Sequence, residues 1–275
     1  MPELPEVETI ARELDSRLAG RTISETHVLR PDVLRETTAG ALVNACSGVS
    51  IRSVHRRAKS VVIELATDHF VLIQPRFTGA VIVDAPGLPA ADSAYTVVHW
   101  QLSEGGAFRY RDVRRLGTVT LLDASGMARY HARIGDEPLD PAFTPDRLSV
   151  LLRGSRSAVK KVLMDQRVLA GVGNIYANEA LFEAGIDPSR EARGLMPEET
   201  SALHEALVSI LHASIQARGT TFRDYRDPSN QAGGYAAQLR AYGRGGEPCV
   251  RCGTPLAETH AIDGRTTVFC FRCQH

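Results

Sequence analysis

The chain begins Met1-Pro2-Glu3-Leu4-Pro5-Glu6-Val7-Glu8-Thr9, and no other stretch carries as much information. The small proline after the initiator methionine favours its removal, which would leave Pro2 with a secondary amine. The ordinary pKa of an α-amino group lies well below that of lysine, so more of it is uncharged at neutral pH. Attack of this amine on a sugar aldehyde carbon forms a cationic iminium, which accepts electrons during elimination. Glu3 places a carboxyl group beside the same carbon for proton transfer.

The same stretch also fits the start of a helix, because proline and acidic residues are both favoured in the first turn. Residues 2–20 carry apolar side chains on one helical face, and Gly20 fits the position just after the helix end. The apolar positions are Val7, Ile10, Ala11, Leu14 and Leu18. The sequence therefore predicts an amphipathic N-terminal helix.

The length of 275 residues allows two modest domains, each with its own core. No apolar run is long enough to cross a bilayer, and the N-terminus is acidic, so a secreted or membrane protein is not expected. The formal net charge of zero argues against a general nucleic-acid coat protein. Lysine occurs only at Lys59, Lys160 and Lys161. A genomic preference for arginine explains most of this bias and makes the three lysines notable.

Four of the five cysteines lie close to the C-terminus, as Cys249-x2-Cys252 and Cys270-x2-Cys273. This spacing is typical of a four-thiolate zinc site. Four thiolates complete the tetrahedron, so one structural Zn2+ is expected. Two disulfides are the alternative, but nothing in the sequence points to an oxidising compartment. Cys46 stands alone and is expected to be a small buried apolar residue.

Short β-rich runs separated by turn residues fill the chain from Arg21 to about Asp123, which predicts an antiparallel β-sandwich. The runs are residues 60–65, 70–73, 80–83, 95–100 and 118–122. A stretch rich in proline and acidic residues around 135–141 is interpreted as an interdomain linker.

Beyond the linker the periodicity of apolar residues predicts helices. The expected ranges are 146–153, 157–165, 175–184 and 197–217. Residues 219–246 are polar and glycine-rich, and are expected to form a mobile loop. The glycine turn at 169–173 leads into a helix whose first N–H groups can bind a phosphate, with Asn174 as an additional donor.

Several stretches match a known family in order and spacing: PELPEVET at 2–9, RRAK at 56–59, LMDQRVLAGVGNIYANEALFEAGIDP at 163–188, and YGRGGEPCVRCG with FCFRC near the C-terminus. Through them the chain resembles, from end to end, the formamidopyrimidine-DNA glycosylases, the bacterial Fpg/MutM branch of the Fpg/Nei superfamily. The resemblance implies an α+β multidomain protein. Its expected parts are an N-terminal β-sandwich with a capping helix (1–132), a linker (133–145), a helix–two-turn–helix domain with a lesion-capping loop (146–246) and a zinc-finger β-hairpin (247–275).

The resemblance also implies roles for individual residues. Mature Pro2 corresponds to the nucleophile that displaces the damaged base and forms a Schiff base, and Glu3 to the general acid that assists opening of the deoxyribose ring. Glu6 corresponds to a second active-site carboxylate. Lys59 corresponds to a lysine that contacts the phosphate and supports the chemistry. Successive β- and δ-eliminations then leave a one-nucleotide gap, with no metal or nicotinamide required.

Further residues are implied to bind DNA. Asn174 and Arg265 correspond to residues that clamp the phosphates flanking the lesion, and Lys160 to another phosphate-binding position. Tyr235 and its neighbours align with the loop that closes over the everted base. Eversion costs roughly a few kcal/mol, which phosphate contacts and an inserted wedge offset.

Two turns depart from the family pattern. The family's His-Leu-Gly-Met-x-Gly is Gln74-Pro75-Arg76-Phe77-Thr78-Gly79 here (the Phe77 turn), so Phe77 replaces the methionine that fills the space of the everted base. The family's Asp-Pro-Arg-Arg-Phe-Gly is Asp112-Val113-Arg114-Arg115-Leu116-Gly117 (the Leu116 turn). Leu116 thus replaces the wedge phenylalanine, whereas Arg114 is retained as the reader of the orphaned base. Lesion preference is the property that these changes affect.

The function implied is that of a bifunctional glycosylase and lyase, which removes 8-oxoguanine and ring-opened formamidopyrimidines from duplex DNA. A monomer in the bacterial cytoplasm, associated with the nucleoid when acting on DNA, is expected. One alternative is the endonuclease VIII-like specificity for oxidised pyrimidines, against which Leu4 argues, because that branch usually has glycine there. The other is a non-catalytic, lesion-binding zinc-finger protein, which would bind DNA without cleaving it.

Overall fold

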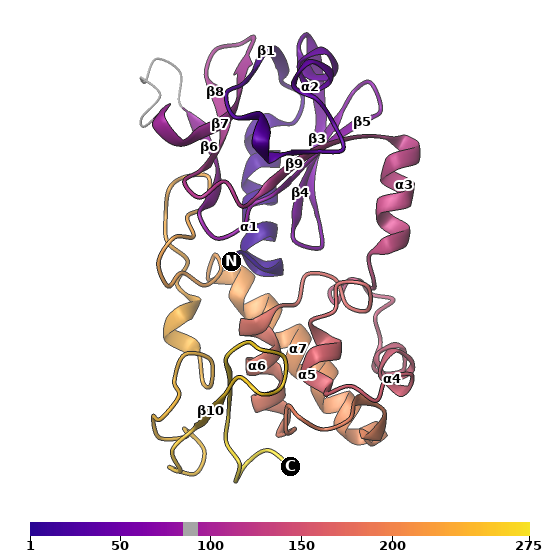
Figure 1. Ribbon diagram of the computed structural model, residues 1–275, viewed down its shortest axis with the longest axis vertical. Helices are drawn as coiled ribbons and strands as arrows, with labels where there is room; N and C mark the ends of the chain where they lie inside the picture. The colour runs from indigo at the N-terminus through magenta and orange to yellow at the C-terminus, as the bar shows by residue number, and fades with distance from the viewer. Residues whose placement is uncertain (85–92) are drawn as a thin grey trace. The chain divides into compact units, whose positions relative to one another are not determined.

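Figure 1 shows the computed structural model of the chain, which describes residues 1–84 and 93–275. The chain divides into two compact units. They are Met1–Ala132 with Ala217–Gly234, and Arg133–Gln216 with Tyr235–His275. No helix within the described ranges is long and apolar enough to cross a membrane.

The first unit is built mainly from β-strands. Its elements are α1 (Leu4–Leu18), β1 (Thr22–Val28), η1 (Pro31–Val33), β2 (Leu34–Arg35), α2 (Ala39–Cys46), β3 (Val49–Arg57), β4 (Ser60–Leu65), β5 (His69–Gln74), β6 (Gly79–Asp84), η2 (Ser93–Tyr95), β7 (Thr96–Leu102), β8 (Ala107–Asp112), β9 (Thr118–Asp123) and α3 (Ala124–Arg133). The five predicted β-rich runs all lie in strands, although the run at 95–100 begins at the end of η2.

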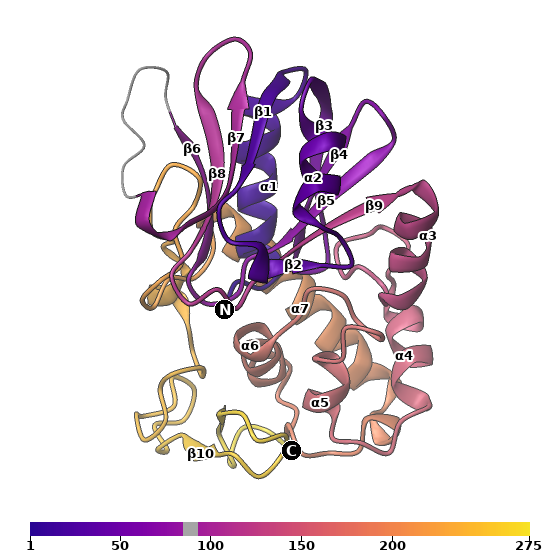
Figure 2. The ribbon, with the colours of Figure 1, turned by 45° about the horizontal axis from the view of Figure 1, so that its top comes forward.

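Nine strands are connected in the order β2-β9-β5-β4-β3-β1-β7-β8-β6. Neighbours are antiparallel except for β2 and β9. The pairing of β1 with β3 covers only two residue pairs. The sheet therefore divides at this point into two halves, which enclose a common apolar core together with α1 (Figure 2). This arrangement confirms the predicted β-sandwich with its N-terminal helix.

α1 contributes the predicted apolar face to this core. Val7, Ile10, Leu14 and Leu18 have no exposed surface. Burying an aliphatic side chain of this size stabilises the fold by about 1.5–3 kcal/mol. The helix ends at Leu18, and Gly20 follows with a φ of +81°, a conformation that favours glycine.

Two helices of the first unit were not predicted. α2 begins after Thr38, whose Oγ1 accepts a hydrogen bond from Ala41 N at 3.2 Å. α3 begins after Asp123, whose Oδ1 accepts one from Gly126 N at 2.7 Å. α2 is too short to show helical periodicity, and Asp-Ala-Ser-Gly at the start of α3 is typical of a turn. The capping side chain is the one local sign of each helix.

The second unit is mainly helical. Its elements are α4 (Pro145–Arg153), α5 (Val159–Leu163), α6 (Asn174–Ala184), η3 (Ala192–Gly194), α7 (Pro197–Gln216), η4 (Tyr235–Gln238), β10 (Ala257–Thr259) and β11 (Thr267–Phe269). The four predicted helices are all present, although α5 is shorter than expected. β10 and β11 form an antiparallel hairpin between the two cysteine pairs.

Residues 217–234, which we call the returning loop, follow α7 in the chain but belong to the first unit. Sequence analysis placed them with the helical domain and expected a mobile segment. The two ends of the loop are joined by a hydrogen bond from Gly234 N to Ala217 O at 2.8 Å. Tyr225 and Asp227 are buried within it. The segment thus lacks regular secondary structure, but its two ends are hydrogen-bonded to each other and some of its side chains are buried.

Candidate functional site

The start of α1 gathers the predicted nucleophile and both predicted carboxylates. Glu3 is the N-cap residue and forms a capping box with Glu6, in which each side chain accepts a hydrogen bond from the backbone N–H of the other. The distance from Glu3 N to Glu6 Oε2 is 2.8 Å. Pro2, Glu3 and Glu6 are all buried. The positive end of the helix dipole favours carboxylates at this position.

Glu6 also connects the N-terminus to the returning loop. Its Oε1 accepts a hydrogen bond from Thr220 N at 2.7 Å, while its Oε2 accepts the one from Glu3 N. Gly219 approaches so closely that a Cβ atom there would lie 2.9 Å from Glu6 Cγ. Tyr225 donates its hydroxyl to Glu6 O at 3.3 Å, and burial together with the nearby Glu6 charge raises the pKa of Tyr225. Tyr225 therefore stays protonated as a donor.

Lys59 lies in the turn between β3 and β4 and is buried. Ala58 before it has a φ of +53°, which is uncommon for a residue other than glycine. Arg56 holds this turn, donating from Nη1 to Ala58 O at 3.0 Å and from Nε to Glu8 Oε2 at 2.7 Å. α1 therefore carries the N-terminal cluster and, through Glu8, also positions the turn of Lys59.

The charge on Glu8 is maintained by its partners. Burial alone would raise the pKa of this carboxyl, but the guanidinium groups of Arg56 and Arg12 outweigh that effect and lower the pKa. The Glu8–Arg56 ion pair is thus present at neutral pH.

Asp112 connects the Phe77 turn with the Leu116 turn. Its side chain is almost completely buried, with 1% exposed. Its donors are Thr78 Oγ1 at 2.6 Å, Arg114 N at 3.2 Å, Gly117 N at 2.8 Å and Tyr110 OH at 3.0 Å. A Cβ atom at Gly117 would lie 1.8 Å from the Tyr110 hydroxyl oxygen, so this position requires glycine. One buried carboxylate therefore fixes both turns that depart from the family pattern.

The two turns present Phe77, Arg114 and Leu116 at the surface. Phe77 is 42% exposed and Leu116 is 40% exposed. The Arg114 guanidinium lies 5.2 Å from the centre of the Phe77 ring, a cation–π contact. Phe77 has a φ of +44°, an uncommon conformation for a bulky residue and one often found at functional sites. Exposed apolar side chains beside an arginine are suited to insertion between bases.

In the second unit, Asn174 and Arg265 are brought close together. Asn174 is the first residue of α6, and its Nδ2 donates to Thr266 O at 2.9 Å. One turn along, Asn178 Oδ1 accepts a hydrogen bond from Val268 N at 2.8 Å. Arg265, next to Thr266, is exposed. The N-terminus of α6 and an arginine of the hairpin thus form the pair expected to bind phosphates.

Lys160 is buried beneath the hairpin. Its side chain has no exposed surface, and its Nζ donates to Thr267 Oγ1 at 2.7 Å and to Thr266 O at 3.3 Å. Asp263 lies 3.6 Å from the same nitrogen. Lys160 therefore holds the segment next to Arg265, and its contact with a phosphate stays a prediction.

Tyr235 is buried at the start of η4. It follows the returning loop, is 5% exposed, and lies 6.3 Å from Tyr176 between ring centres. Burial and the charge of Glu179 raise the pKa of Tyr235 to about 12. The Glu179 carboxylate accepts hydrogen bonds from the backbone N–H groups of Arg240, Ala241 and Tyr242. Tyr235 thus packs inside the second unit, and its place in a loop that closes over an everted base stays a prediction.

The four C-terminal cysteines form a metal site. Their sulfur atoms all lie within 4.8 Å of one another, and none is in a disulfide. Cys249 and Cys273 are 4.0 Å apart, and Cys252 and Cys270 are 3.5 Å apart, measured between Sγ atoms. Zn–S bonds of 2.3 Å in a tetrahedron require sulfur atoms about 3.8 Å apart. The residues therefore fit one structural zinc.

Three sequence families match consecutive parts of the chain. They are the formamidopyrimidine-DNA glycosylase N-terminal domain over residues 1–119, the formamidopyrimidine-DNA glycosylase H2TH domain over residues 134–226, and the zinc finger found in FPG and IleRS over residues 246–275. The chain belongs to the formamidopyrimidine-DNA glycosylase family. The formamidopyrimidine-DNA glycosylase of Herpetosiphon aurantiacus is 41% identical over 275 residues, with all of both chains covered. That of Desulforamulus reducens is 37% identical, with 100% of this chain and 99% of the relative covered.

Solved structures of the family have the same fold. The MutM (Fpg) protein of Thermus thermophilus gives a TM-score of 0.86 at 33% identity, over 99% of this chain and 98% of the other. The Lactococcus lactis Fpg in complex with DNA containing an abasic site gives 0.90 at 30% identity, with 99% of each chain covered. The same enzyme bound to DNA containing N7-benzyl-Fapy-dG also gives 0.90 at 30% identity, with 100% of each chain covered.

Sequence reasoning missed the residues that hold the site in place. Asp112 was given no role beyond its place in the turn motif, although aspartate side chains often bond the backbone N–H two residues on, as Asp112 does with Arg114. Arg56 was noted only as part of the RRAK motif. Their distant partners, Thr78 and Glu8, gave no local sign of the contact.

Proposed function

We propose that this chain removes oxidised purines from duplex DNA in base-excision repair and then cleaves the strand by β- and δ-elimination. The observation that carries the proposal is the buried N-terminal cluster, in which the Glu3–Glu6 capping box fixes the residue next to Pro2 at the start of α1. Membership of a family with relatives named formamidopyrimidine-DNA glycosylase, and with structures bound to lesion-containing DNA, supports it.

Pro2 is the nucleophile in this proposal, once Met1 has been removed. With Met1 attached its nitrogen is an amide and cannot attack. The secondary amine forms a bond to C1′ of the damaged nucleotide, while the bond from C1′ to the base breaks and its electron pair leaves with the base, which takes up the proton that the amine nitrogen releases. Glu3 donates the proton that the ring oxygen takes up when the deoxyribose opens. The product is an iminium joining Pro2 to C1′.

The iminium draws electrons from the sugar and acidifies its C2′ protons. Loss of such a proton expels the 3′ phosphate, and a second elimination expels the 5′ phosphate, which leaves a one-nucleotide gap. Lys59 contacts the phosphate and supports these steps. Glu6 holds the backbone of Glu3, and so the nucleophile beside it, by the hydrogen bond already described.

The DNA contacts are divided between the two units. We assign the phosphates flanking the lesion to Asn174 and Arg265, the orphaned base to Arg114, and the space left by the everted nucleotide to Phe77 and Leu116. The zinc cross-links the hairpin that carries Arg265 and, with four thiolate ligands, keeps no open position for chemistry. A monomer is sufficient for these contacts. We also propose that the protein is cytoplasmic and associates with the nucleoid when it acts on DNA.

Strand cleavage on a panel of duplexes tests this function. The panel contains 8-oxoguanine opposite cytosine, a formamidopyrimidine, thymine glycol, an abasic site and undamaged DNA. We expect the protein to cleave the 8-oxoguanine, formamidopyrimidine and abasic duplexes. The Glu3→Gln variant should lose this cleavage but still bind DNA. Glu198→Gln, an exposed change in the first turn of α7, is the matched control. Preference for thymine glycol would indicate the endonuclease VIII-like specificity, and binding without any cleavage would reject the enzyme.

A further inference from the structure

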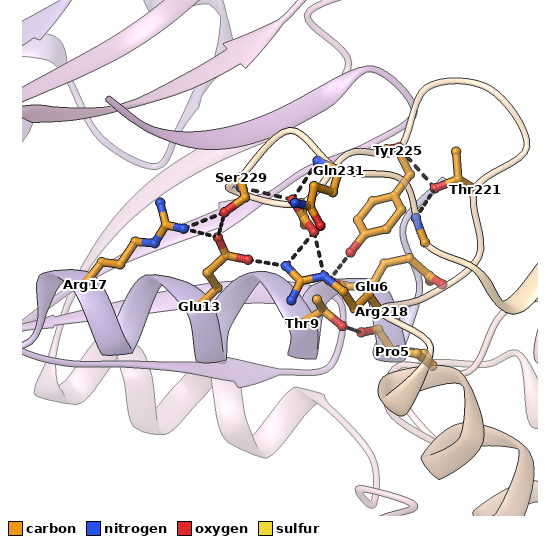
Figure 3. A network of polar contacts seen from close by, with 12 residues as sticks. Pro5, Glu6, Thr9, Glu13, Arg17, Arg218, Thr221, Tyr225, Ser229 and Gln231 are labelled. Atoms are coloured by element: carbon orange, nitrogen blue, oxygen red, sulfur yellow. Dashed lines mark hydrogen bonds and ion pairs between the residues drawn. The ribbon is translucent and has the colours of Figure 1, made fainter. Parts of the chain in front are cut away.

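The returning loop is attached to α1 at two places. At the first, near the N-terminus, Thr220 N and Tyr225 OH bond to Glu6, as described above. At the second, further along the helix, Arg218 contacts Glu13 and Ser229 contacts Arg17 (Figure 3). The two attachments lie on one helix, so the second can control the geometry of the first.

The second attachment is an ion-pair network. Arg218 donates from Nε to Asp227 Oδ2 at 2.8 Å, and its Nη2 lies 2.5 Å from both Asp227 Oδ2 and Glu13 Oε2. Glu13 also accepts from the Ser229 hydroxyl and pairs with Arg17 at 2.7 Å. Figure 3 shows Arg218 and Ser229 beside Glu13 of the helix. The Arg218 guanidinium therefore bridges a carboxylate of the loop and a carboxylate of the helix, and the Ser229 hydroxyl adds a second bond to Glu13.

The network also shapes the loop itself. Asp227 is completely buried, and its Oδ1 accepts hydrogen bonds from Ser229 N at 3.0 Å and Gln231 N at 2.8 Å. Arg218 has a φ of +62°, which is costly for a residue other than glycine and persists only where surrounding contacts hold it. It immediately precedes Gly219 and Thr220, the residues that approach Glu6. The conformation of Arg218 thus sets the path of the chain into the first attachment.

We propose that Arg218, with Glu13 and Asp227, is a positioning residue for the N-terminal nucleophile. The ion pairs keep Thr220 N on one oxygen of Glu6, and this keeps the other oxygen on Glu3 N beside Pro2. The inference rests on the proposed function, because its effect is seen in the chemistry at Pro2. Released from Arg218, the loop would leave Glu6 without its Thr220 donor, and the capping box would lose its fixed orientation.

The test compares Arg218→Gln with Arg52→Gln in the full chain. Arg52 of β3 is also an arginine of the first unit that bridges two carboxylates, but its partners are Glu64 and Asp68, which lie outside the returning loop. Single-turnover cleavage of an abasic-site duplex at saturating enzyme reports the chemical step apart from DNA affinity. We expect Arg218→Gln to lower this rate constant roughly fivefold or more, the size of coupling within one charged network. The dissociation constant for the duplex should stay within about twofold.

Two further variants separate positioning from general damage. Arg218→Lys keeps a charge between Glu13 and Asp227 and should restore part of the rate, which a purely structural loss would not predict. If Arg218→Gln does not fold, Glu13→Gln removes only the helix partner and should still slow the chemical step. A rate in Arg218→Gln or Glu13→Gln equal to that of Arg52→Gln would overturn the inference. A wild-type protein that cleaves no lesion duplex would instead reject the proposed function.

Discussion

Replacing Asp112 by alanine is expected to destabilise the first unit and to disorganise the surface expected to meet DNA. This carboxylate accepts hydrogen bonds from Thr78 of the Phe77 turn, from Arg114 and Gly117 of the Leu116 turn, and from Tyr110 of β8. Two of them, Gly117 N and Tyr110 OH, belong to buried residues and have no access to water in the folded state. The alanine variant would leave both without their partner.

The magnitude follows from these two donors. A buried donor deprived of its partner costs about 1–3 kcal/mol, so Asp112→Ala should lower the free energy of unfolding by roughly 2–6 kcal/mol. Asp112→Asn keeps the shape and one acceptor oxygen but points an amide N–H₂ at donors. It should therefore fall between alanine and the wild type.

Urea unfolding monitored by tryptophan fluorescence measures the stability of the first unit, which contains Asp112. Trp100 is the one tryptophan of the chain, and it is stacked 4.7 Å from Phe108 in the core of the first unit. Asp123→Ala is the matched control, because Asp123 also accepts two hydrogen bonds but lies at an exposed helix start. A loss in Asp112→Ala no greater than that in Asp123→Ala would refute the role of Asp112 as the connection between the two turns.

Three other outcomes are expected. The pKa of Glu8 is lowered in the folded state, so ionised Glu8 stabilises the fold fully above the ordinary pKa of 4.5, and this stabilisation is lost as the pH falls through the lowered pKa. The difference in urea midpoint between wild type and Glu8→Gln should therefore be largest at pH 7 and shrink below pH 4.5. Removing zinc with a thiol reagent and a chelator should release one ion per chain and abolish duplex cleavage, with little change in the Trp100 unfolding midpoint; full cleavage by zinc-free protein would contradict the role given to the hairpin. Asn174→Ala should weaken binding to lesion and undamaged duplexes about equally, as expected for a phosphate contact, and a loss confined to one lesion would argue against this.

The elements that could be predicted from sequence are those in which the signal is local. The apolar face of α1 has helical spacing, and its burial follows directly. The spacing of the cysteines predicted the four ligands of the metal site. Each Cys-x2-Cys pair is local in sequence, and the short hairpin between the pairs brings them together. Pro2, Glu3 and Glu6 are neighbours in the chain, so any helix beginning there brings them together.

The contacts that hold the site in place could not be predicted, because their partners are far apart in sequence. Asp112 and Thr78 are separated by 34 residues, and Arg218 and Glu13 by 205. The burial of Lys160 was not predicted, since lysine is rarely buried without a partner. Its partners on the hairpin, Thr266 and Thr267, become neighbours only when the hairpin packs onto the helices.

Borohydride trapping tests the central claim most directly. Methionine-processed protein is incubated with a duplex carrying 8-oxoguanine opposite cytosine, reduced with borohydride and digested, and the peptide bound to DNA is sequenced. We predict a covalent adduct on Pro2, and none with protein that retains Met1 and so has no amine there. An adduct on another residue, or no adduct although the duplex is bound, would contradict the assignment of Pro2 as the nucleophile.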